Sequence, residues 1–231
     1  MFSVFQPARR ILYAPFLLIC LLTGSCAEER IRFPEPQPSG TKADARLRKP
    51  FPGTYFNAED SVWLLISEDN IRMSNHLVWE SGKSEEGGFE GQFSVGKDSV
   101  KNIKIEVQSR GKGDSLDVDT HFEELVIDLN KGGVAKYYKG YYFLNTPIEG
   151  ENAYRLRILQ EEKHGVSMLS IQSDSVLHLL EKDGYLSKSE PENGEEEIWT
   201  LKPSRRQLRD LMKKGLFAGR IYFERQEPGG K

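Results

Sequence analysis

The strongest constraint on the fold of this chain is an alternation of apolar and polar residues with a period of two. It appears in residues 103–108 (IKIEVQ), 154–158 (YRLRI) and 220–224 (RIYFE). Successive side chains of a β-strand point to opposite faces, so each run predicts a strand with one buried face and one face in water, as in antiparallel sheets. Further strands are expected to begin near Thr54, Val62, Ile71, Phe89, Leu116, Leu125, Tyr141, Val166 and Glu197.

Short turn signals separate these runs. An Asp-Ser pair followed by an apolar residue recurs at Asp60, Asp98, Asp114 and Asp174, and both side chains can bond to nearby backbone and favour a turn. Strand-sized runs with such turns predict a mainly β fold, an antiparallel meander that forms a barrel or a sandwich, with a lipocalin-like barrel among the options. A repeated GTYF/GYYF pattern, at residues 53–56 and 140–143, fits either two similar half-domains or a favourable strand start.

One helix is expected before the last strand, within residues 204–215 (SRRQLRDLMKKG). Ser204 and Gln207 have the spacing of a capping box, and Gly215 can end the helix. The apolar residues between them form one stripe, which should cover an end or opening of the sheet. A weaker apolar pattern at residues 176–180 fits a helix or a buried strand equally well.

The N-terminus has the three parts of a secretory signal. Arg9 and Arg10 precede an apolar run over residues 11–23, which is too short to span a bilayer comfortably. The run ends at small residues and Cys26, and residues 22–26 (LTGSC) resemble the lipobox of bacterial lipoproteins. The alternative is an ordinary signal peptide with an incidental cysteine.

The lipobox resemblance implies cleavage between Ser25 and Cys26 and acylation of Cys26, with diacylglycerol on its sulfur and a fatty acid such as palmitate on its amine. Several acyl chains on one residue exceed what stable anchoring requires. The other cysteine, Cys20, would be removed with the signal, so Cys26 is expected to be an attachment point and not half of a disulfide. Two acidic residues follow in Ala27-Glu28-Glu29, a pattern similar to the surface-export signal of lipoproteins of the Bacteroidota. The alternative is an ordinary polar tether.

Charge and composition divide the rest of the chain. We expect a signal peptide over residues 1–25, an acylated cysteine with a proline-rich tether over 26–52, one β-rich domain over 53–226 and a short tail over 227–231. Cleavage would remove two arginines and change the formal net charge from −3 to −5. This mildly acidic charge, with both signs interspersed, predicts no nucleic-acid partner.

Three segments of the C-terminal half carry a resemblance to a known family: residues 138–146 (YKGYYFLNT), 154–159 (YRLRIL) and 201–208 (LKPSRRQL). They resemble uncharacterised lipoproteins of flavobacteria and their relatives. That family has no assigned activity. The resemblance therefore implies a β-rich fold and lipid anchoring at the bacterial outer membrane, on the periplasmic or the cell-surface side, and it implies no catalytic or binding residue.

Motifs for catalysis are absent from the sequence: it has no G-x-S-x-G, P-loop, G-x-G-x-x-G or H-E-x-x-H pattern. We therefore expect no enzyme activity and no cofactor. The best polar cluster is Asp117, Asp119 and His121, which would project from one face of a strand at a spacing of about 6.6 Å. An adjacent pair of these residues could hold a divalent ion, but such a face is more often simply solvated.

Aromatic residues are concentrated at residues 137–143, where they could line a cavity in a barrel or fill its core. The leading functional hypothesis is a lipid-anchored, non-enzymatic binding or interaction module with a membrane anchor and an envelope partner. The alternative is a lipocalin-like carrier of a small hydrophobic ligand. A third hypothesis is a metal-assisted hydrolase that uses Asp117, Asp119 and His121. An open apolar cavity would favour the carrier, and a filled interior would favour the interaction module.

Overall fold

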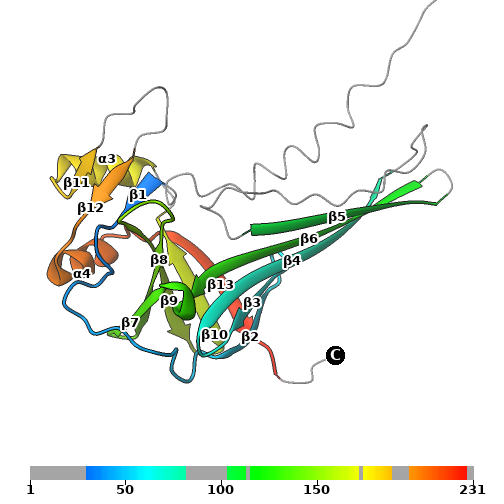
Figure 1. Cartoon of the computed structure of the whole chain (residues 1–231), viewed down its shortest axis with the longest axis horizontal. Helices are drawn as coiled ribbons and strands as arrows, with labels where there is room; N and C mark the ends of the chain where they lie inside the picture. The colour runs from blue at the N-terminus through cyan, green and yellow to red at the C-terminus, as the bar shows by residue number, and fades with distance from the viewer. Residues whose placement is uncertain (1–29, 82–102, 113–114, 172–173, 189–197, 228–231) are drawn as a thin grey trace, which may run out of the picture.

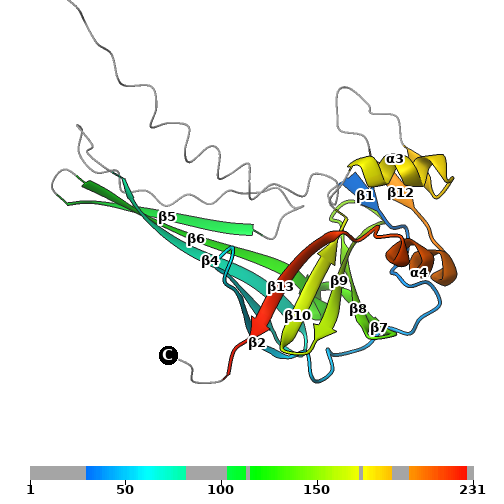
Figure 2. The same ribbon diagram turned by 180° about the vertical axis from the view of Figure 1, so that it is seen from behind.

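The computed structural model describes residues 30–81, 103–112, 115–171, 174–188 and 198–227, and its fold is mainly β. A ten-stranded antiparallel sheet has the strand order β5-β6-β4-β3-β2-β13-β10-β9-β8-β7. It curls into a half-barrel, which confirms the predicted fold class (Figures 1 and 2). Its strands are β2 (Gly53–Asn57), β3 (Val62–Ile66), β4 (Asn70–Ser81), β5 (Ile103–Lys112), β6 (Ser115–Asp128), β7 (Val134–Tyr138), β8 (Tyr141–Pro147), β9 (Tyr154–Glu162), β10 (Gly165–Ser170) and β13 (Gly219–Arg225).

The concave face of the curled sheet encloses the inner core. This core draws apolar side chains from most of the strands and from the segment before β2; its fully buried members include Tyr55, Leu64, Ile71, Ile127, Tyr142, Leu159 and Phe223. The hydroxyl of Thr146 on β8 donates to the carbonyl of Val126 on β6 at 2.8 Å, so two strands that are distant in sheet order meet across the curl. The 3-10 turn η1 (Leu129–Lys131) connects β6 to β7 beside this contact.

The convex face of β8–β10 is covered by a second layer that forms the outer core. This layer consists of α3 (Asp174–Lys182), α4 (Arg205–Lys213) and a small sheet of β1 (Ile31–Arg32), β12 (Trp199–Leu201) and β11 (Leu186–Lys188). Leu177 and Leu208 from the two helices pack with Phe143 of β8 and Trp199 of β12. Burial of apolar surface on both faces is what stabilises these central strands.

The predicted C-terminal helix is confirmed as α4. Ser204 accepts a hydrogen bond from the backbone of Gln207, and the Gln207 side chain accepts one from the backbone N–H of Ser204, which completes the capping box. Leu208 and Leu211 are buried as the apolar stripe required. The ambiguous pattern at residues 176–180 is helical and lies in α3.

Residues 30–52 are not a free tether, and this corrects the expected start of the domain at residue 53. Ile31 and Phe33 are buried in the outer core, and Leu47 and Phe51 are buried in the inner core. The prolines of this segment limit regular sheet pairing, but the apolar residues between them still gain stability from burial. Proline content therefore correctly indicated irregular backbone and wrongly indicated separation from the domain.

The same segment closes the open side of the half-barrel. The backbone N–H of Asp44 donates to Ala135 on β7 at 2.8 Å, and the backbone N–H of Leu47 donates to Glu68, between β3 and β4, at 2.6 Å. Next to this contact, where Val134 of β7 pairs with Asn145 of β8, Asn145 is fully buried and accepts from the backbone N–H of Gln37 at 2.7 Å. The segment before β2 thus connects the edge strand β7 to the β3–β4 turn in the middle of the sheet.

Several strand predictions need correction. The starts expected near Leu116 and Leu125 belong to one strand, β6, whose register against β4 shifts near Leu125. The short strands β1, β7 and β11 were not predicted, because their sequences show no clear alternation of apolar and polar residues. The expected starts at Phe89 and Glu197 lie outside the described residues. Among the described residues, no helix is long and apolar enough to cross a membrane.

Candidate binding clefts at the rim of the half-barrel

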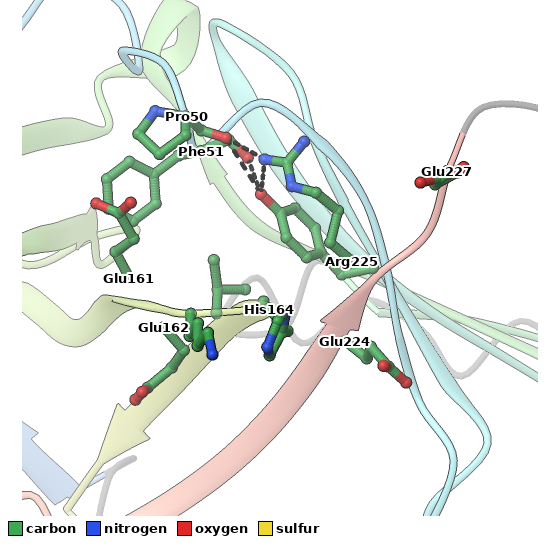
Figure 3. Close-up of a pocket in the computed structure, with 12 residues that line it drawn as sticks. Pro50, Phe51, Glu161, Glu162, His164, Glu224, Arg225 and Glu227 are labelled. Carbon is green, nitrogen blue, oxygen red and sulfur yellow. Dashed lines mark hydrogen bonds between the residues drawn. The ribbon is translucent and has the colours of Figure 1, made fainter.

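The first candidate site is a cleft of about 330 Å³ at the end of the half-barrel where the β9–β10 turn meets β2 and β13 (Figure 3). In the hairpin register Glu162 pairs with Gly165, so Lys163 and His164 form the turn that stands at its mouth. A Cβ atom at Gly165 would lie 2.0 Å from the carbonyl oxygen of Phe223. Glycine is therefore required for β10 to approach β13 this closely.

Tyr55 and Arg225 both line this cleft. Arg225 is labelled in Figure 3. The Tyr55 hydroxyl donates to the carbonyl of Phe51 at 2.6 Å and accepts from the Arg225 guanidinium. The guanidinium also donates to the carbonyl of Pro50, and it stacks over the Tyr55 ring at 4.8 Å from the ring centroid. These contacts fix the aromatic ring and the charge relative to each other before any ligand arrives.

Burial sets the protonation state of the Tyr55 phenol in this cleft. Burial raises the pKa of Tyr55 above its usual value of 10.0, and Arg225 acts in the opposite direction. The phenol is therefore protonated at neutral pH and is not poised to act as a base. The cleft is also lined by four carboxylates, those of Glu161, Glu162, Glu224 and Glu227. Its lining is therefore acidic apart from Arg225 and Lys163.

A second cleft of about 550 Å³ adjoins the first and has the opposite charge. It is lined by cationic residues of the segment before β2, Arg46, Arg48 and Lys49, together with Glu68. Arg46 pairs with Glu68 at 2.9 Å, and Arg48 pairs with Asp44. Pro50 and Arg225 line both clefts. The rim thus presents an acidic and a basic hollow side by side, a pattern that suits a partner carrying both charges.

The predicted cleavage and lipid-attachment residues, Ser25 and Cys26, lie outside the described residues. The lipobox interpretation therefore rests on the sequence alone.

The weak metal candidates are only partly placed. Asp117, Asp119 and His121 lie on β6, but among them only the side chain of His121 is described, and it faces His76 on β4. Within the described part of the chain, no three His, Cys, Asp or Glu side chains could share a metal ion.

Two residues of the aromatic run at 137–143 fill the cores, whereas Tyr137 is exposed. Tyr142 and Phe143 are buried on opposite faces of β8, the first in the inner core and the second in the outer core. Phe51 packs edge-on against Tyr142 with ring centroids 5.0 Å apart. The Tyr142 hydroxyl accepts from the backbone N–H of Arg48 at 3.0 Å, which ties the segment before β2 to the sheet.

Sequence reasoning missed both rim clefts. Tyr55 and Arg225 are 170 residues apart, and their contact depends on the pairing of β2 with β13. The only local signal was the Gly-x-Tyr-Phe pattern at residues 53–56, which indicates a strand start but no partner. No protein-family model, curated protein or solved structure matches this chain, so its fold and clefts must be interpreted from their own geometry.

Proposed function

We propose that this chain is a bacterial envelope lipoprotein, anchored through Cys26, whose β-domain binds a macromolecular partner at the two rim clefts. The observation that carries the proposal is the contrast between a filled interior and an open, charged rim. In a carrier, the apolar side chains inside the barrel would line an open cavity. In this half-barrel they pack against one another. The hollows formed by residues 46–55, 161–166 and 224–227 lie at its rim instead.

The filled interior favours the interaction module over the lipocalin-like alternative. Leu64, Ile71 and Ile127 project into the inner core with no exposed surface, and Tyr142 and Phe223 close against them. Ligand cavities for small molecules are typically 300–1,000 Å³ and mostly apolar. Both rim clefts reach that size, but their linings are rich in carboxylates and guanidinium groups, which do not suit a hydrophobic ligand.

The rim charges favour a protein partner from the envelope. Adjacent patches of opposite sign orient an incoming surface and exclude partners of a single sign. Tyrosine and arginine are also among the residue types that most often carry binding energy at protein interfaces. Tyr55 and Arg225 are already held in one geometry, so little side-chain entropy is lost when a partner binds.

Anchoring at Cys26 would orient these clefts. β1 begins at Ile31, five residues after Cys26, and five extended residues reach at most about 18 Å. β1 also lies at the opposite end of the sheet from the β9–β10 turn (Figures 1 and 2). An anchored chain would therefore hold its helical end close to the bilayer and turn its rim clefts away from it.

The anchor is tested by Cys26→Ser and by globomycin. We expect globomycin to block maturation and the serine variant to appear in the soluble fraction, because it lacks the sulfur that takes the lipid. Mass spectrometry of the mature N-terminus should find acyl groups on Cys26. A serine variant that fractionates with membranes as the wild type does contradicts the anchor.

The binding module is tested with a photo-crosslinking residue placed at Lys163, in the β9–β10 turn, and at Lys182 on the distant α3 as the matched control. We expect one adduct of defined mass in cells from position 163 and its loss when Glu161→Lys reverses the charge of the cleft. Equal adducts from both positions contradict a rim site. Saturable one-to-one binding of a fluorescent fatty acid, insensitive to Glu161→Lys, would instead favour the carrier.

A further inference from the structure

A histidine pair bridges two strands on the extended arm formed by β4, β5 and β6 (Figure 1). His76 on β4 lies directly opposite His121 on β6 in the antiparallel register. Their ring centroids are 6.3 Å apart, and the rings are arranged edge to face. His76 is exposed and His121 is half-buried, so solvent and ions reach the pair. The two residues are 45 positions apart in sequence, and only the strand pairing brings them together.

The spacing of the two rings is close to that of a shared metal ion. A histidine nitrogen binds Zn²⁺ at about 2.0–2.1 Å, which puts the ring centre about 3.2 Å from the ion. Two such rings at a tetrahedral angle have centres about 5.2 Å apart. The observed pair would have to close by about 1 Å, a change that small rotations about the side-chain torsions of two solvent-accessible rings can supply.

We propose that His76 and His121 form a two-histidine site for a divalent transition-metal ion such as Zn²⁺, Ni²⁺ or Cu²⁺, with water completing the coordination. Imidazole nitrogen is the ligand type that these ions prefer, whereas Mg²⁺ and Ca²⁺ prefer oxygen. Two acidic positions lie beside the pair. Glu106 on β5 is opposite His121 in register, and Glu123 follows it on the same strand face, where it pairs with Arg72 at 2.7 Å.

The site differs from the one that the sequence alone indicated. Asp117, Asp119 and His121 are alternate residues of one strand, spaced at about 6.6 Å, whereas directly opposite residues on paired strands bring their Cβ atoms to about 4.5–5.5 Å. A cross-strand pair is therefore the better chelate. Its ion would clamp β4 to β6 on the arm, independently of the rim clefts and of the function proposed for them.

The experiment is a calorimetric titration of the full chain, purified without a polyhistidine tag, with Zn²⁺ and separately with Ni²⁺. Variants His76→Ala, His121→Ala and the double variant test the pair. His164→Ala in the β9–β10 turn and His178→Ala on α3 are matched controls, since each removes one accessible histidine elsewhere. The double variant also measures binding to any other groups of the chain.

We expect each single variant of the pair to weaken binding at least ~10-fold, because the second ligand acts as an intramolecular partner of the first. The double variant should lose at least as much binding as either single variant, and the two controls should bind as the wild type does. Wild-type binding equal to that of the double variant overturns the proposal. So does an equal loss in His164→Ala or His178→Ala.

Thermal unfolding separates lost ligands from lost structure. A bound ion that is absent from the unfolded chain raises the unfolding midpoint. Added Zn²⁺ should therefore raise the midpoint of the wild type and of the controls, and leave the double variant unchanged. His76→Gln and His121→Gln provide a second set, which retains a polar side chain. Variants that match the wild-type circular dichroism and still gain stability from Zn²⁺ contradict the site.

Discussion

The two faces of β8–β10 are buried by different means. The inner face is covered by the sheet itself, which curls until side chains from β2, β3, β6 and β13 meet those of β8–β10. The outer face is covered by α3, α4 and the β1-β12-β11 sheet. β1 precedes the half-barrel in sequence, and the other elements lie between its strands β10 and β13. Phe143 and Tyr142, adjacent on β8, enter these two different cores.

The two cores hold together different parts of the domain. The inner core joins both halves of the large sheet, so its loss should affect the whole domain. The outer core joins a helical layer to three strands, and it can loosen while the sheet persists, because cooperative units of a protein open with different free energies. β10 belongs to both cores and has six consecutive buried residues, a pattern usual for the doubly covered strands of parallel sheets.

The largest expected effects come from deleting one phenylalanine on each face. Phe223→Ala (inner) and Phe143→Ala (outer) should each lower the free energy of unfolding by about 3–5 kcal/mol in urea denaturation, because both rings are fully buried. Hydrogen exchange should distinguish them. The inner variant should lose protection throughout the sheet, and the outer variant mainly in α3, α4 and β12. Identical exchange patterns would contradict separate roles for the inner and the outer core.

The next effect concerns the segment that reaches both cores. Asn145→Ala should cost about 1–3 kcal/mol in the same assay, because it leaves the buried backbone N–H and carbonyl of Gln37 without their partner. The exposed Asn130→Ala is the control and should change stability by less than about 0.5 kcal/mol. Equal values for the two variants would mean that residues 30–52 do not depend on this contact.

Gly165→Ala should destabilise the inner core at the rim by about 1–3 kcal/mol, because the added methyl group meets the backbone of β13 and the strands must separate. Gly150→Ala isolates the cost of a positive φ, since a Cβ there meets open space at φ +78. We expect that control to cost about 1 kcal/mol. A thermal-melt series in which the control is the more damaging variant contradicts the close strand approach.

The smallest expected effect is that of Tyr55→Phe, about 1 kcal/mol at pH 7, from the loss of the hydrogen bonds to Phe51 and Arg225. Burial raises the folded-state pKa of Tyr55, so its contribution is fully present below the unfolded value near 10.0 and declines as the pH rises through the folded value. The stability difference between wild type and variant should therefore shrink above about pH 10. A difference that stays constant through that range would contradict burial of the hydroxyl.

Elements with a local cause were predictable. The alternation at residues 154–158 and 220–224 lies in β9 and β13, and the capping box at Ser204 starts α4, because side-chain direction and capping depend on residues a few positions apart. The rim site was not predictable in this way. Tyr55, Arg225 and the β9–β10 turn come from three distant parts of the chain, and nothing in their own neighbourhoods specifies the partner.

From the sequence alone, the alternating strands such as β9 and β13, the capped helix and the mainly β class were predictable, since these follow from periodicity and local hydrogen bonding. Tertiary structure decided that residues 30–52 pack into both cores, that β10 is buried on two faces, and that His76 meets His121. The physical reason is that burial depends on which surfaces finally face each other. Apolar residues of a proline-rich segment gain stability from burial in a core even where the backbone forms little regular pairing.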